Sequence, residues 1–175
     1  MGDDAAVSRT QTLVRFVFGS RATIAGTVYG TIVVLAVLSA GGKTYRHNLW
    51  GLIAIVDVTV LVLWLAHVYA HGLGESLQVG RRLQRGALRA VARRELAIPL
   101  AAVVPTAALV LGAVGLLDAR TAEWLAFWLG VATLAVQGVR YARVERLSRS
   151  GALIAVAVNV TLGLVLVLLE VIVSH

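Results

Sequence analysis

The sequence predicts an all-α, polytopic membrane protein with five transmembrane helices in one domain over residues 1–175. Hydrophobic residues make up 59% of the chain and charged residues 14%, whereas about a quarter of an average soluble domain is charged. The mean hydropathy is +0.86. Five stretches approach the roughly 20 apolar residues that a helix needs to cross a bilayer. So little polar surface excludes a soluble globular domain and a disordered tail.

The apolar stretches follow a short arm, expected over residues 1–21, and are separated by polar loops. All five are expected to be helices, because lipid offers no hydrogen-bond partner to open backbone. The third stretch contains Pro99 and Pro105, and Pro105 could open that helix. The expected spans are 22–40, 50–71, 96–117, 124–139 and 151–173.

The basic residues predict the orientation. Thirteen of the sixteen Lys and Arg residues fall in the arm and in the loops after the second and fourth spans. Basic loops stay in the cytoplasm, so we expect a cytoplasmic N-terminus and a C-terminus outside. Trp50 and Trp124 open spans on the expected outer side, as interfacial anchors do. Fifteen of the basic residues are Arg, which suggests a GC-rich bacterial genome and hence the bacterial plasma membrane.

The segment 76–94 is basic and partly amphipathic. We expect a cytoplasmic helix that lies on anionic lipid headgroups, or alternatively a docking or regulatory element. Because the basic excess sits in loops, it is assigned to a membrane surface, and no nucleic-acid partner is expected. The candidate lipid or partner contacts are Arg81, Arg82, Arg85, Arg89, Arg93 and Arg94.

Two ladders of small residues mark faces where helix backbones can approach closely. Such ladders serve contacts inside a protomer or across a dimer. A homodimer is the expected assembly, because five helices enclose little volume. The ladders are Ala22, Gly26 and Gly30 in the first span, and Gly151, Ala155, Asn159 and Gly163 in the fifth.

The second span contains Asp57, His67, His71 and Glu75. A charged group at membrane depth costs about 2.5–3.5 kcal/mol or more, so each requires a reason. Helical periodicity puts Asp57, Trp64, His71 and Glu75 on one stripe, with His67 beside it. Two imidazoles and a carboxylate can hold a divalent cation or relay protons, since His titrates near neutrality. The alternative is that both imidazoles sit at the inner interface, satisfied by water and backbone.

Further polar candidates are Tyr29 in the first span and Asn159 and Glu170 in the fifth. For each alone, interhelical hydrogen bonding is the alternative. The chain has no Cys, which excludes disulfides and thiolate metal sites. It contains neither a phosphate-binding Gly-rich loop nor a Gly-x-Ser-x-Gly elbow, and no enzymatic activity is expected.

Two local runs carry a family resemblance: Gly26-Thr27-Val28-Tyr29-Gly30 and His71-Gly72-Leu73-Gly74-Glu75. They resemble the Gly-x-x-Asp-Gly and Met-x-x-Gly-Glu motifs of the vacuolar iron transporter family. That family has five spans, a cytoplasmic N-terminus, a cytoplasmic helical segment after span two and a dimeric assembly.

The resemblance implies that Tyr29 stands where the family has its metal-binding Asp. It also implies that His71 replaces the Met and that Glu75 matches the Glu. The Tyr removes a carboxylate that a hard cation would favour, and no acid occurs between Glu75 and Glu95. The resemblance is therefore compatible with a shared scaffold in which metal transport is altered or lost.

Three functions remain open. The first is a transporter or exchanger for a divalent metal ion, with proton coupling as an option. His67, His71 and Glu75 would form its inner site, and Tyr29 and Asn159 would line the path. The second is a non-transporting membrane subunit whose Arg-rich face binds anionic lipid or an acidic protein. The third is a haem or quinone protein, which needs a ligand from a second helix besides His67 or His71.

Overall fold

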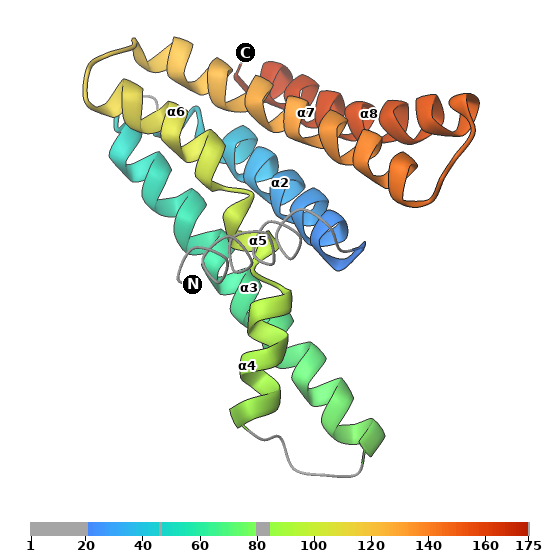
Figure 1. Ribbon diagram of the computed structural model, residues 1–175. Coiled ribbons are helices and arrows are strands. Elements are labelled where there is room, and N and C mark those ends of the chain that lie inside the picture. The colour runs from blue at the N-terminus through green and yellow to red at the C-terminus, as the bar shows by residue number, and fades with distance from the viewer. Residues whose placement is uncertain (1–20, 46, 80–84, 175) are drawn as a thin grey trace, which may run out of the picture.

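A computed structural model describes residues 21–45, 47–79 and 85–174. The expected arm, up to residue 20, lies outside the described residues. Within them the fold is all-helical, without a strand, which confirms the predicted class (Figure 1). The helices are α2 (Arg21–Gly41), α3 (Leu49–Val79), α4 (Arg85–Arg94), α5 (Ala97–Leu100), α6 (Val103–Ala113), α7 (Ala119–Val144) and α8 (Arg149–Ser174).

Four of the described helices are long and apolar enough to cross a membrane, namely α2, α3, α7 and α8. The segment Arg85–Leu100, together with α6, makes a fifth crossing only if this bent pair counts as one span. Four of the expected spans therefore correspond to continuous helices, and the third corresponds to a broken one.

The break in the third span lies between its two prolines. α5 ends at Leu100 and α6 begins at Val103, and the segment Arg85–Leu100 is bent by 46° relative to α6. Pro105 has no N–H to donate to the carbonyl of Ala101, one turn earlier. The prediction that this proline opens the helix is confirmed. α6 then ends at Ala113, short of the expected end at residue 117.

α3 is longer than the second span that the sequence predicts. It runs to Val79 and has 31 residues, about 46 Å at 1.5 Å per residue, against an apolar bilayer layer of about 30 Å. No proline follows the apolar run, so the helix continues through the polar residues. Figure 1 shows the end of α3 and α4 projecting together from the bundle.

α4 is packed against α3 through its apolar side. Val91 is buried, and the indole N–H of Trp64 donates to the carbonyl of Ala92 at 3.3 Å. The segment predicted to lie flat on a surface thus contains, in its described part, the second leg of a helical hairpin.

α2 is the central helix, with contacts to α3, α5, α7 and α8. Its residues Val34, Leu35 and Leu38 are fully buried in the apolar core. α3, α6 and α7 supply most of the rest of this core, with Leu52, Val56, Leu109, Phe127 and Leu134, and α5 and α8 add Ile98 and Val167.

The small-residue ladders are used inside the protomer. An added Cβ on Gly26 would lie 3.0 Å from the Cβ of Ala97 in α5, and one on Gly30 would collide with the carbonyl oxygen of Ile98. In α8, Gly163 meets Leu134 of α7 at 3.0 Å in the same way. The expected homodimer stays a prediction.

A side-chain cap starts α7. Asp118 Oδ1 accepts a hydrogen bond from the backbone N–H of Thr121 at 2.9 Å. Hydrogen bonds from the Thr121 side chain and backbone stabilise the carboxylate and hold the pKa of Asp118 below its usual 3.8.

Candidate functional site

Three aromatic rings lie in a row between α2 and α3. The ring centroids of Tyr29 and His67 are 5.1 Å apart, and those of His67 and His71 are 5.2 Å apart. His67 is half-buried and His71 exposed. His71 Nδ1 lies 3.1 Å from the carbonyl oxygen of His67, so it can donate there while Nε2 stays accessible. The two imidazoles of α3 thus lie next to the phenol ring of Tyr29 on α2.

Tyr29 also lines a cavity of about 530 Å³ between α2, α7 and α8. Asn159 faces the same cavity and donates from Nδ2 to the carbonyl of Ala155 at 2.9 Å. Gln137 is buried at the cavity and accepts from Arg140 at 3.0 Å. The predicted pathway residues Tyr29 and Asn159 therefore line one cavity, and Tyr29 connects it to the two imidazoles.

The ionisable stripe of α3 faces the next part of the chain. Asp57 Oδ1 accepts from the hydroxyl of Thr106 on α6 at 2.9 Å. Glu75 forms an ion pair with Arg94 on α4 at 3.6 Å. Trp64, between them, bonds to α4 as described above. The stripe is largely the seam between α3 and the α4–α6 segment.

Asp57 is not part of one cluster with His71 and Glu75. Eighteen residues separate Asp57 from Glu75, about 27 Å along the helix axis. A shared angular position on a helix does not bring such residues together. The structure divides the predicted set into the His67–His71 pair, the Glu75–Arg94 ion pair and the Asp57–Thr106 hydrogen bond.

The described side chains do not form a three-ligand metal site. Among residues 21–45, 47–79 and 85–174, no three His, Asp or Glu side chains converge to hold a metal ion. What the structure offers is a pair of adjacent imidazoles, with Glu75 held by Arg94. Divalent-metal binding stays a prediction, as does haem ligation.

The basic residues of α4 divide in two. Arg85, Arg89 and Arg93 are exposed, whereas Arg94 contacts Glu75 and, from Nε at 3.3 Å, Glu95. Two of the predicted contacts, Arg81 and Arg82, lie outside the described residues. The same holds for the side chain of Glu170.

Sequence reasoning did not select several residues of these sites. Thr106 lies 49 positions from Asp57 in the chain, so no local periodicity connects the two. Its place directly after Pro105, one turn past the helix break, is the signal that could have selected it. Tyr141 and Glu145 line the cavity of Tyr29. Both lie at the C-terminal end of α7, where the sequence has the composition of an ordinary segment at a membrane interface.

No protein-family model, no curated protein and no solved structure matches the chain. Any function therefore has to be argued from its own residues.

Proposed function

We propose that the chain is a five-span transporter of the plasma membrane, with its N-terminus in the cytoplasm, and that it couples solute transport to protons through Tyr29, His67 and His71. The observation that carries the proposal is the position of Tyr29. Its ring lies against His67 and also lines the cavity that Asn159 shares. Proton coupling requires titratable groups at a mouth and polar side chains in the cavity behind them, and Tyr29, Gln137 and Asn159 line this otherwise mostly apolar cavity.

The depth of the imidazoles supports a place at one mouth. His67 comes 18 residues after Leu49, about 27 Å along α3, near the far edge of an apolar layer about 30 Å thick. The exposed Arg residues of α4 follow on the same side, which by the distribution of basic residues is the cytoplasmic side. The bent pair of α4–α5 and α6 supplies the fifth span.

The side chains of Tyr29, His67 and His71 are suited to accept and pass on a proton. Imidazole exchanges protons near neutral pH, and the Tyr29 hydroxyl both donates and accepts hydrogen bonds. An imidazolium at His67 would lie within cation–π range of the Tyr29 ring. A divalent metal as cargo belongs to the same proposal, in line with the resemblance to vacuolar iron transporters.

The test is proton flux in liposomes loaded with a pH-sensitive dye, under an imposed membrane potential, with Mn²⁺, Fe²⁺, Co²⁺ or Zn²⁺ added in turn. We expect His67→Ala and His71→Ala to reduce the flux to that of protein-free liposomes. His47→Ala is the matched control, because His47 is exposed before the start of α3. Unchanged flux in both α3 variants would refute proton coupling at this row.

The cargo is tested in the same vesicles by metal uptake. If a divalent ion is carried, Glu75→Gln and His71→Ala should lower its uptake while His47→Ala does not. Proton flux that persists without uptake of any of these ions would exclude them as cargo and leave proton coupling standing.

A second candidate is a non-transporting subunit whose basic α4 face binds anionic lipid or an acidic partner. The observation in its favour is that Val91 uses the apolar side of α4 against α3, while Arg85, Arg89 and Arg93 stay exposed. Each basic residue near an anionic surface contributes about 1 kcal/mol. Replacing these three with Gln should reduce phosphatidylglycerol retention in native mass spectra, and unchanged retention would contradict the lipid interpretation.

A further inference from the structure

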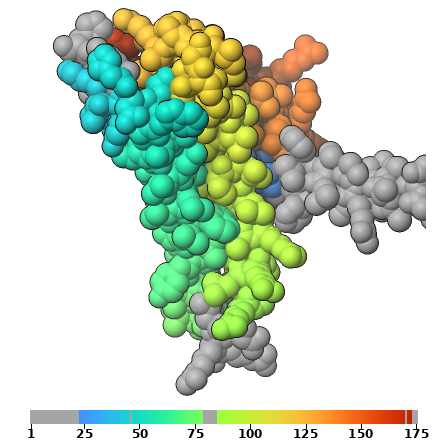
Figure 2. Space-filling model, turned by 90° about the vertical axis from the view of Figure 1, so that its left-hand side faces the viewer, coloured from blue at the N-terminus to red at the C-terminus, as the bar shows by residue number. Residues whose placement is uncertain are grey.

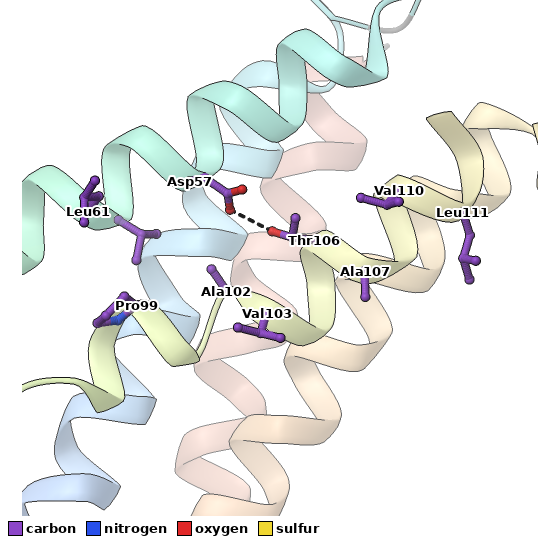
Figure 3. A pocket seen from close by; sticks show the side chains of 10 residues that line it. Asp57, Leu61, Pro99, Ala102, Val103, Thr106, Ala107, Val110 and Leu111 are labelled. Carbon is purple, nitrogen blue, oxygen red and sulfur yellow. Dashed lines mark hydrogen bonds between the residues drawn. The ribbon is translucent and has the colours of Figure 1, made fainter. Parts of the chain in front are cut away.

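A groove separates α3 from the broken α5–α6 segment, and one carboxylate faces it. Figure 3 shows Asp57 on one wall and Thr106 on the other, joined by their hydrogen bond. The groove has a volume of about 710 Å³, and apart from these two residues its walls are apolar. Figure 2 shows α3 and the yellow-green segment side by side on the face toward the viewer.

The groove opens sideways onto the apolar exterior of the protein. Its lining residues Leu61, Val103 and Leu111 are all exposed. Asp57 comes eight residues after Leu49, about 12 Å along α3, which places it inside the apolar layer of the proposed membrane. A ligand would therefore enter from the lipid and not from water.

The residues that line the groove with Asp57 include no positively charged side chain. Thr106 donates to Oδ1, which leaves Oδ2 available. No ion pair to Asp57 occurs among the described residues, and neither α3 nor the span 97–113 contains a Lys or Arg. A carboxylate at this depth costs about 2.5–3.5 kcal/mol or more. A bound cation would supply the positive charge that the walls of the groove lack.

We propose that this groove binds a membrane-dissolved organic cation, a single positive charge carried on an apolar body. Ligand pockets commonly measure about 300–1,000 Å³, with mostly apolar walls and a few placed polar groups, as here. A bare divalent ion does not fit, because it requires several oxygen ligands and the groove supplies one carboxylate. Anionic amphiphiles are disfavoured by charge. The inference rests on the proposed membrane placement but not on proton coupling.

The test uses tetraphenylphosphonium as the cationic probe and tetraphenylborate as an anion of matched shape, both with detergent-purified protein in equilibrium dialysis. We expect saturable binding of the cation, and Asp57→Asn should weaken it about tenfold to a hundredfold, the range of one contact to a charged group. Asp57→Glu, which keeps the charge, should retain most of the binding.

A second pair of variants tests the groove without changing the charge. Ala107 lines the groove, and Ala107→Phe should fill part of it and lower the affinity. Ala132 is exposed on α7 and does not line the groove, so Ala132→Phe should bind as the native chain does. His67→Ala should also leave cation binding unchanged, which separates this site from the proton-coupling proposal.

Several outcomes would overturn the proposal: no saturable cation binding, equal binding by Asp57→Asn, or equally tight binding of tetraphenylborate. A second copy of the chain is the other possible occupant. Because the chain contains no Cys, Ala107→Cys gives a single-cysteine protein. Its quantitative disulfide cross-linking between copies in native membranes would show that the groove is a subunit interface, which refutes ligand binding there.

Discussion

Replacing Gly30 with Ala tests the close packing of α2 against α5. An added Cβ would collide with the carbonyl oxygen of Ile98 and lie 2.9 Å from the Cβ of Ala101. Neither atom is the flexible end of a side chain, so the collision is relieved only if α5 moves away from α2. Such movement would also disturb the helix break at Ala101.

The magnitude follows from a comparison with Gly74→Ala. Both glycines are helical, and no atom lies within 4 Å of an added Cβ at Gly74. The intrinsic helix preference for Ala over Gly, about 0.8–1.0 kcal/mol, is gained in both variants and cancels in their difference. What remains is the overpacking cost at Gly30, about 1–3 kcal/mol. At about 2–4 °C per kcal/mol for a chain of this size, Gly30→Ala should unfold about 2–12 °C below Gly74→Ala.

The assay is thermal unfolding in one detergent, followed by far-ultraviolet circular dichroism, with both variants and the native chain measured side by side. The native protein is expected between the two variants or level with Gly30→Ala, where the helix-preference gain offsets the smallest overpacking cost. If Gly30→Ala proves as stable as Gly74→Ala, then α5 does not pack backbone-to-backbone on α2, and the assigned geometry of the broken span is wrong.

Two further changes act through single hydrogen bonds. The pKa of Asp118 is lowered in the folded protein. The stabilisation that its carboxylate provides is therefore complete above the unfolded pKa of 3.8 and is lost as the pH falls through the lower folded pKa. Asp118→Asn still caps the helix but does not titrate, so its Tm should fall less at acid pH than that of the native chain, and parallel Tm–pH curves would contradict this. Ser39 is buried and donates to the carbonyl of Leu166 on α8 at 2.8 Å. Ser39→Ala should lower the unfolding free energy in detergent by about 0.6 kcal/mol, the average for interhelical hydrogen bonds in a membrane protein. An unchanged unfolding free energy would show that this hydrogen bond does not stabilise the fold.

Apolar length predicted the helices well, but their ends less well. α3 shows why, since its second half passes through His71, Gly72, Gly74 and Glu75 without a break. Polarity marks where a helix leaves an apolar layer, and it does not mark where backbone hydrogen bonding stops. Only proline does that strictly, and the one interruption predicted from proline was confirmed.

In the candidate site, too, the sequence predicted contacts between residues close in the chain but not most contacts between distant ones. The i, i+4 spacing of His67 and His71 was enough to predict that they are neighbours, and similar depth suggested Tyr29 as a companion. Ala92 lies 28 residues from its partner Trp64, and Thr106 lies 49 residues from Asp57. Arg94 likewise belongs to a different helix from its partner Glu75. Helical periodicity identifies a face, but it does not tell which element covers that face.

The seam on α3 explains the polar stripe only in part. Bonds from Trp64 to α4 and from Asp57 to α6 fix the rotation of α3 against its neighbours, which apolar contacts alone specify loosely. That role needs a hydrogen-bond acceptor at position 57, and the oxygen of an Asn side chain would also accept from Thr106. The negative charge strengthens this bond, but the register does not require it, and it carries the insertion cost of an ion at the depth proposed for it. Packing therefore accounts for a polar residue at position 57 but not for a carboxylate, and a cation in the groove accounts for both.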